Sequence, residues 1–218
     1  MIEVSTSILS VKEDGVRIFY DLEVAGTNYF HIDVMDGKFV ENNTENQMLE
    51  YATTLSHITN LGMDVHLMCE NIEKYVDDYI MLEPDSITFH IEAIKNKEQA
   101  LNIITDIKNN SVKVGIALNP DTEIEKILDY LPYIHKVLVM TVVPGKGGQK
   151  LIKQTIDKIK QLKKYICDNN LETVIEADGG INSDNISILS EAGCEIVVSG
   201  NYIISSKNMK EAIDSLKY

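Results

Sequence analysis

The chain has 218 residues, enough for one sizeable hydrophobic core, and we expect a single domain over residues 1–218. Its formal net charge of −14 argues against nucleic-acid binding, because proteins bind a phosphate backbone through basic surfaces. No apolar run is as long as a membrane span, and the N-terminus MIEVSTSILS has no basic head before an apolar core, so we expect neither a membrane partner nor a secretory signal.

The three cysteines are widely spaced, at Cys69, Cys167 and Cys194. This spacing fits neither a disulfide framework nor a zinc ribbon. We therefore expect free thiols and a cytoplasmic location, where the environment is reducing.

Eight short apolar segments are predicted to be strands, and amphipathic segments lie between them. Such alternation is typical of a parallel α/β fold, and eight units in a chain of this length fit a compact (β/α)8 TIM barrel. A doubly wound open sheet is the alternative, but the glycine fingerprint expected after its first strand is absent from the sequence. The predicted strands are residues 2–8, 28–34, 63–68, 85–91, 112–118, 136–142, 172–177 and 195–199.

Three of the intervening segments are clear helix candidates. Residues 151–170 carry apolar side chains three, four and seven positions apart, which predicts an amphipathic helix. Residues 121–131 follow a proline, a common opening signal for a helix. Residues 183–193 begin with capping side chains and end with a glycine, so they too are predicted to be helical.

Polar residues lie at the ends of most predicted strands. In a barrel these ends meet at one mouth, where the active site is found, whereas in an open sheet they spread along an edge. Convergence on one mouth explains why so many ends are polar, so the pattern favours the barrel. The residues are Ser7, His31, Asp33, His66, His90, Glu92, Asn119, Thr141 and Asp178.

The segment HIDVMDG, residues 31–37, indicates a metal site. Residues two apart in a strand point to the same face, so His31 and Asp33 share a face while Ile32 and Val34 point the other way. A buried ionisable pair is costly unless something compensates its charge. A metal ion would do so.

Two further strands complete the predicted ligand set. DVHLM contributes His66, and VIEADGG contributes Asp178. Two imidazoles and two carboxylates suit one divalent metal cation, with Zn²⁺ or Fe²⁺ favoured and Mn²⁺ or Co²⁺ as alternatives. Glu176 shares the face of Asp178 and is expected to orient a ligand. The alternative is that the histidines are core residues and that Asp178 is a turn residue.

Three glycine segments predict a phosphate site. PGKGGQ, residues 144–149, lies between a strand and a helix, where glycines let backbone N–H groups approach an anion. Phosphate sites after the last two strands are common in barrels, although three ordinary turns are the alternative. PGKGGQ is not a Walker loop, because it lacks the Gly-Lys-Ser/Thr ending. The residues of the glycine segments are Gly145, Lys146, Gly147, Gly148, Gly179, Gly180, Gly200 and Asn201.

Together these motifs resemble the ribulose-phosphate 3-epimerase family. TSILS, HIDVMDGKFV, DVHLM, FHIEA, VGIALNP, VMTVVPGKGGQ, EADGGI and SGNYI follow one another in family order, from Thr6 to Ile203. The resemblance implies a (β/α)8 barrel, one catalytic divalent metal and a homo-oligomer. It also implies a small-molecule sugar phosphate as substrate and the interconversion of D-ribulose 5-phosphate and D-xylulose 5-phosphate through an enediolate.

The resemblance also implies a role for each matching residue. It gives His31, Asp33, His66 and Asp178 as metal ligands, and Asp33 and Asp178 as the acid/base pair as well. It gives Ser7, His66 and Asp178 as substrate contacts and the residues of the glycine segments as the phosphate site. Met35, Met68 and Met140 match methionines that line the family's site.

The chain departs from the family pattern outside the four ligands. Thr6 stands in place of proline, Lys146 in place of phenylalanine and Asn201 in place of serine. The alternatives are therefore an epimerase of another ketose phosphate, such as allulose 6-phosphate, and a non-catalytic sugar-phosphate-binding protein. A barrel decarboxylase or synthase is disfavoured, because DVMDG has no lysine between its carboxylates.

Overall fold

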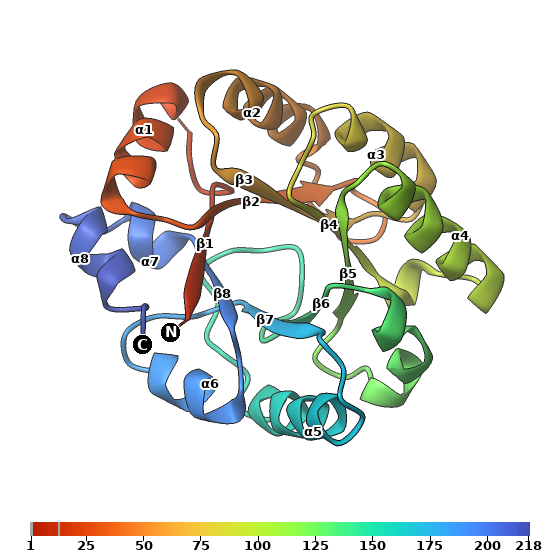
Figure 1. Ribbon diagram of the computed structural model, residues 1–218. Coiled ribbons are helices and arrows are strands. Elements are labelled where there is room, and N and C mark those ends of the chain that lie inside the picture. Colours follow the sequence, from red (N-terminus) through yellow and green to blue (C-terminus); the bar gives the residue numbers. More distant parts are fainter. Residues whose placement is uncertain (1, 13) are drawn as a thin grey trace.

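The computed structural model describes residues 2–12 and 14–218, whose eight strands form one closed barrel (Figure 1). Each strand pairs in parallel with the next, and β8 returns to pair with β1. This topology confirms the predicted TIM barrel and excludes the open sheet. The strands are β1 (Glu3–Ser7), β2 (Tyr29–Met35), β3 (Gly62–Met68), β4 (Ser86–His90), β5 (Lys113–Leu118), β6 (Lys136–Met140), β7 (Val174–Asp178) and β8 (Ile196–Ser199).

Helices surround the barrel and cover its outer face (Figure 1). The helix predicted over 151–170 is present but shorter, and the one predicted over 183–193 starts later and ends where Gly193 takes a left-handed conformation. In the described residues, no helix combines the length and the apolar character that a membrane crossing requires. The helices are α1 (Gly15–Ala25), α2 (Glu45–Ile58), α3 (Ile72–Ile80), α4 (Lys97–Asn109), α5 (Thr155–Asp168), α6 (Ile186–Ala192), α7 (Asn201–Ile204) and α8 (Met209–Asp214).

The prediction of an α-helix over residues 121–131 is wrong. The segment forms two short 3-10 helices, Ile124–Lys126 and Leu128–Tyr133, between β5 and β6. Pro132 lies inside the second of these. Proline has no N–H to donate and disfavours the α conformation in the residue before it, so the last turn of the predicted α-helix is disfavoured.

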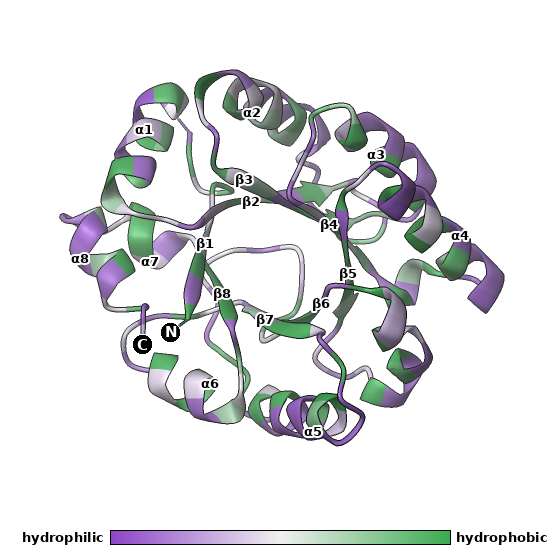
Figure 2. Ribbon diagram, in the orientation of Figure 1, coloured by the Kyte–Doolittle hydropathy of each residue, from purple (hydrophilic) through white to green (hydrophobic). Residues whose placement is uncertain are grey.

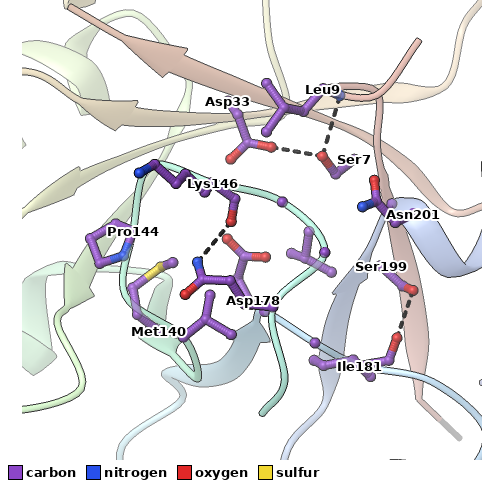
Figure 3. Close-up of a pocket in the computed structure, with 18 of the residues that line it drawn as sticks. Ser7, Leu9, Asp33, Met140, Pro144, Lys146, Asp178, Ile181, Ser199 and Asn201 are labelled. Carbon is purple, nitrogen blue, oxygen red and sulfur yellow. Dashed lines mark hydrogen bonds between the residues drawn. The ribbon is translucent and has the colours of Figure 1, made fainter. Parts of the chain in front are cut away.

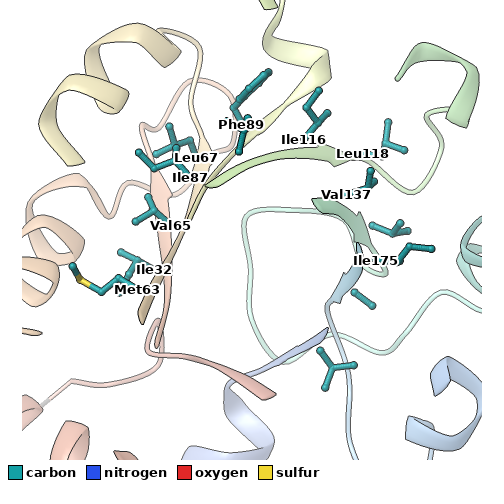
Figure 4. Packing of buried hydrophobic residues seen from close by; sticks show 14 of the residues in the cluster. Ile32, Met63, Val65, Leu67, Ile87, Phe89, Ile116, Leu118, Val137 and Ile175 are labelled. Atoms are coloured by element: carbon teal, nitrogen blue, oxygen red, sulfur yellow. The ribbon is translucent and has the colours of Figure 1, made fainter. Parts of the chain in front are cut away.

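The outward faces of the strands form the main hydrophobic core with the helices. Side chains alternate along each strand, and those facing the helices, such as Ile32, Val65 and Phe89, are apolar and fully buried (Figure 4). In Figure 2 the strands and helices carry both colours, and α1 leaves Val16, Tyr20 and Val24 exposed. Cys69 and Cys194 are buried, and all three cysteines are free, as predicted.

The inward faces are far more polar. Barrel interiors are usually filled by branched apolar side chains, but here the second apolar cluster contains only Ala117, Leu138, Met140, Val142 and Val198 among the described residues. Ionisable and hydroxyl side chains take most of the remaining inward positions, and their burial requires partners inside the barrel. The buried polar residues at inward positions are Ser5, Ser7, His31, Asp33, Asp64, His66, Ser86, Thr88, His90, Lys136 and Glu176.

Candidate metal and active site

The four predicted ligands come together at the mouth of the barrel. His31 and Asp33 lie on β2, His66 lies on β3 and Asp178 ends β7. The register pairs Asp33 directly with His66 across β2 and β3. One possible ligand atom from each of the four side chains lies within 4.8 Å of the other three. The fold therefore brings together residues that are far apart in the sequence.

The distances between these atoms suit a single cation. His31 Nε2 lies 3.4 Å from Asp33 Oδ1 and 3.9 Å from Asp178 Oδ2. His66 Nδ1 lies 3.3 Å and 3.7 Å from the same two oxygens. Two atoms that each lie about 2.0–2.2 Å from one ion are at most about 4.4 Å apart. All four distances are within this limit.

The two histidines each present one unpaired nitrogen to this cluster. Among the described residues, His31 Nε2 and His66 Nδ1 have no hydrogen-bond partner, although both rings are 0% exposed. The opposite nitrogens are paired, His31 Nδ1 with Asp64 Oδ2 at 2.7 Å and His66 Nε2 with His90 Nε2 at 2.9 Å. A buried, unpaired imidazole nitrogen needs an explanation, and a metal ion supplies one. The residues present therefore fit a divalent cation.

A hydrogen-bond chain determines which nitrogen of His66 is unprotonated. Glu92 Oε2 accepts from His90 Nδ1 at 3.0 Å, so in the neutral ring His90 Nε2 accepts from His66 Nε2–H. Burial lowers the pKa of His90 to about 4 against the opposing effect of Glu92, which keeps the ring neutral. His66 Nδ1 is then left with a lone pair directed at Asp33 and Asp178.

The two carboxylates differ in their proton affinity. Burial opposes the charge on Asp33, but the positive charge of His31 outweighs it and holds the pKa of Asp33 below its ordinary value. Burial, reinforced by the charge of Asp33, raises the pKa of Asp178 to about 7. Ser7 Oγ donates to Asp33 Oδ2 at 2.7 Å, which leaves Oδ1 facing the histidines. One ionised and one protonated carboxyl group side by side can act as a base and an acid.

A cavity lies directly above the cluster (Figure 3). Its volume of ≈ 230 Å³ is below the roughly 300–1,000 Å³ typical of pockets for drug-sized ligands, so it suits a small metabolite. The carboxylates of Asp33 and Asp178 line it, while His31 and His66 are buried beneath. Every residue of the glycine segments lines it too, together with Ser7, Met35, Met68 and Met140.

Glycines let the loops after β6, β7 and β8 pack closely around this cavity. Gly180 has a φ of 68°, and a Cβ there would lie 2.5 Å from the backbone nitrogen of Leu151. Gly148 has a φ of 75°, and a Cβ there would lie 2.8 Å from Asn201 Nδ2. Both positions therefore require glycine, and the three predicted glycine segments form one wall rather than three separate turns.

Lys146 lies at the rim of the cavity rather than in its depth. Its Nζ lies 3.4 Å from Glu41 Oε2, and both side chains are largely exposed. Lys146, which stands in place of the family's phenylalanine, is therefore paired with Glu41 on the loop that follows β2.

Glu176 does not contact any of the four ligands by a hydrogen bond or ion pair in the described residues. It pairs with Lys136 at 2.6 Å, below the cluster. Lys136 in turn pairs with Asp64, which holds His31. Glu176 therefore connects to the ligand His31 only through Lys136 and Asp64, and neither of these two residues is part of the predicted site.

Comparison with known proteins decides the family. A sequence model described as the ribulose-phosphate 3-epimerase family matches residues 3–204. The chain belongs to the ribulose-phosphate 3-epimerase family. It is 38% identical to the ribulose-phosphate 3-epimerase of Methanocaldococcus jannaschii, over 100% of this chain and 90% of that one. It is 34% identical to the enzyme of the same name from Bacillus subtilis, over 100% and 99% of the two chains.

Membership of this family makes the protein an isomerase-class enzyme, in agreement with the prediction. Among solved structures, a 3-hexulose-6-phosphate synthase superposes with a TM-score of 0.72, covering 99% of this chain and 97% of its own. Its sequence identity is only 12%, so this likeness shows the shared barrel fold alone.

We predict that metal affinity at this site rises with pH. Burial opposes a positive charge on His31, but Asp33 and Asp64 outweigh it and hold the pKa of His31 well above its ordinary value. A metal must displace that proton, so the apparent affinity for Mn²⁺ should increase about tenfold per pH unit for each proton displaced. Isothermal titration between pH 6 and 8 measures this slope.

The control for that titration is His57→Gln, which alters an exposed histidine on α2. This variant should retain the wild-type slope. An affinity that does not change with pH would contradict proton displacement at the cluster.

Proposed function

We propose that the protein interconverts D-ribulose 5-phosphate and D-xylulose 5-phosphate at this cavity. The observation that supports the proposal best is the pair of carboxylates, Asp33 and Asp178, that lines the cavity beside two buried, unpaired histidine nitrogens. Epimerisation next to a ketone requires one group to remove the C3 proton and another to return a proton to the opposite face. Two acids in different protonation states meet that requirement.

The proposed metal ligands are His31, Asp33, His66 and Asp178. A divalent cation held there supplies Lewis-acid stabilisation of the negative charge that develops on the substrate oxygens. Zn²⁺ and Fe²⁺ suit the two imidazoles, and Mn²⁺ or Co²⁺ are alternatives.

The proposed proton transfers use both carboxylates in one turnover. Asp33 accepts the proton from C3, the enediolate forms, and Asp178 donates its proton to the other face of C3. Asp33 is then protonated and Asp178 ionised, and exchange with water restores the starting state. The reverse reaction uses the same two groups with their roles exchanged.

The glycine segments are proposed to hold the phosphate group. Backbone N–H groups bind an anion without any positive side chain, which accords with the net charge of −14. Gly147, Gly148, Gly180, Gly200 and Asn201 line the cavity from three loops. The phosphate at that wall would place the sugar carbons toward the carboxylates.

The first test is proton exchange at C3 of D-ribulose 5-phosphate in D2O. We expect deuterium at C3 of the product D-xylulose 5-phosphate, and we expect a chelator to abolish both exchange and conversion. The same assay with D-allulose 6-phosphate tests the alternative substrate. If the metal-loaded protein exchanges neither sugar, it is a non-catalytic binder and the proposal is wrong.

Asp178→Asn should fold, still present an oxygen atom to the cluster, and lose turnover. Loss of a general acid or base costs about 10²–10⁴-fold in rate, so kcat for epimerisation should fall by at least about 10²-fold. The matched control is Asp184→Asn, an exposed aspartate on the following loop. A near-normal rate in Asp178→Asn would rule out the two-carboxylate mechanism.

Asn201→Asp should weaken binding of the phosphate group without impairing proton transfer. The substitution places a negative charge in the cavity wall, so KM should rise by about tenfold or more while kcat changes little. Asn102→Asp, on the exposed face of α4, makes the same change of net charge far from the cavity. Equal KM values for the two variants would place the phosphate elsewhere.

A further inference from the structure

A second charged cluster lies inside the barrel, beneath the candidate metal site. Asp64 on β3, Lys136 on β6 and Glu176 on β7 are exposed by 1%, 3% and 0%. Lys136 Nζ pairs with Asp64 Oδ1 and lies 2.6 Å from Glu176 Oε2. The proposed reaction does not use this cluster, although it buries three ionisable side chains in the barrel interior.

The barrel makes room for the lysine. Gly115 pairs with Lys136 across β5 and β6. A Cβ on Gly115 would lie 3.0 Å from Lys136 Cγ and 2.2 Å from Thr88 Oγ1, so any side chain there would collide with the lysine stem or its neighbour. Burial alone lowers the pKa of Lys136, but Asp64 and Glu176 outweigh it and raise the pKa above its ordinary value. The lysine is therefore a charged and closely packed part of the interior.

Asp64 connects this cluster to the proposed metal site. Its Oδ1 accepts from Lys136 and from Ser86 Oγ, the latter at 3.0 Å. Its Oδ2 accepts from Ser5 Oγ at 2.9 Å and pairs with His31 Nδ1 at 2.7 Å. An ionised carboxylate has about four acceptor positions, and Asp64 uses all of them. Its orientation, and with it the His31 ring, is thus held from four sides.

Apart from His31, Lys136 is the only positively charged side chain in the described residues that contacts the Asp64 or Glu176 carboxylate. His31, Asp64 and Glu176 form a second group of possible cation ligands within 4.8 Å of one another. The ammonium of Lys136 already contacts both acids of that group. Without the ammonium, the buried Asp64 carboxylate that holds His31 loses its ion-pair partner, and an unpaired buried charge is costly.

We propose that Lys136 is a positioning residue for the metal site, acting through Asp64 to hold His31 with Nδ1 protonated and Nε2 directed at the metal. This inference rests on the metal site of the proposed function. It adds a residue that touches neither the metal ligands nor the substrate. Residues that orient metal ligands typically contribute about 10–100-fold to metal affinity or activity.

The test compares Lys136→Met with Glu176→Met. Lys136→Met removes the ammonium that pairs with Asp64, whereas Glu176→Met removes the other acid of the cluster and leaves that ion pair in place. We expect the affinity for Mn²⁺, measured by chelator competition, to fall about tenfold or more in Lys136→Met and to stay close to wild type in Glu176→Met. In ¹⁵N spectra of the chelator-treated protein, the hydrogen-bonded Nδ1–H signal of His31 should be lost only in Lys136→Met.

Two results would overturn the proposal. One is a wild-type affinity and a wild-type His31 signal in Lys136→Met, with thermal stability alone reduced, because the cluster would then be purely structural. The other is an equal loss of affinity in Lys136→Met and Glu176→Met.

A third variant covers the case in which Lys136→Met does not fold. Lys136→Met/Glu176→Met replaces the ion pair by two apolar side chains, an exchange that proteins often tolerate. It should bind Mn²⁺ about tenfold or more weakly than Glu176→Met, and equal affinities would contradict the role of Lys136. If wild type binds no divalent ion, the proposed metal site fails, and the His31 signal still decides whether Lys136 holds that ring.

Discussion

Charge compensation inside a closed barrel is the constraint on which this structure depends. Inward positions on the eight strands carry acids and histidines that are almost fully buried, and buried charges need partners. Deep in the barrel, Lys136 supplies the positive charge between Asp64 and Glu176. At the mouth, two carboxylates and two unpaired imidazole nitrogens are arranged for an external cation. A lysine thus meets this requirement in one layer, and in the other the residues present fit a divalent cation.

The depth of each aspartate determines what it can do. Asp64 is surrounded by donors on all sides, so none of its oxygens is available for proton transfer. Asp33 uses one oxygen for Ser7 and turns the other toward the cluster. Asp178 lies at the end of its strand, and burial beside Asp33 raises its pKa to about 7. Three residues of one type therefore suit three roles, as a support, a base and an acid.

The sequence predicts the barrel and the metal cluster because both depend on local patterns. Alternation of apolar runs identifies the strands, and the two-residue spacing of His31 and Asp33 places both on one face. The sequence does not reveal Lys136 as a partner of Asp64, because these residues lie on strands that are not neighbours and meet only across the closed interior. The signal available in the sequence was Lys136 itself, a charged residue in an otherwise apolar strand. The prediction for residues 121–131 was wrong because it rested on the opening signal at Pro120 and took no account of Pro132.

The two histidines show how the protein prepares the site before any ion binds. His31 is held at Nδ1 and presents Nε2, whereas His66 is held at Nε2 and presents Nδ1. Each ring is held by a carboxylate, directly by Asp64 or through His90 by Glu92. Because these partners come from different strands, neither ring can rotate without breaking a buried hydrogen bond, which is costly. The orientations of both rings, and the direction of the His66 lone pair, are therefore properties of the folded barrel, and a binding metal has only to displace the proton on His31.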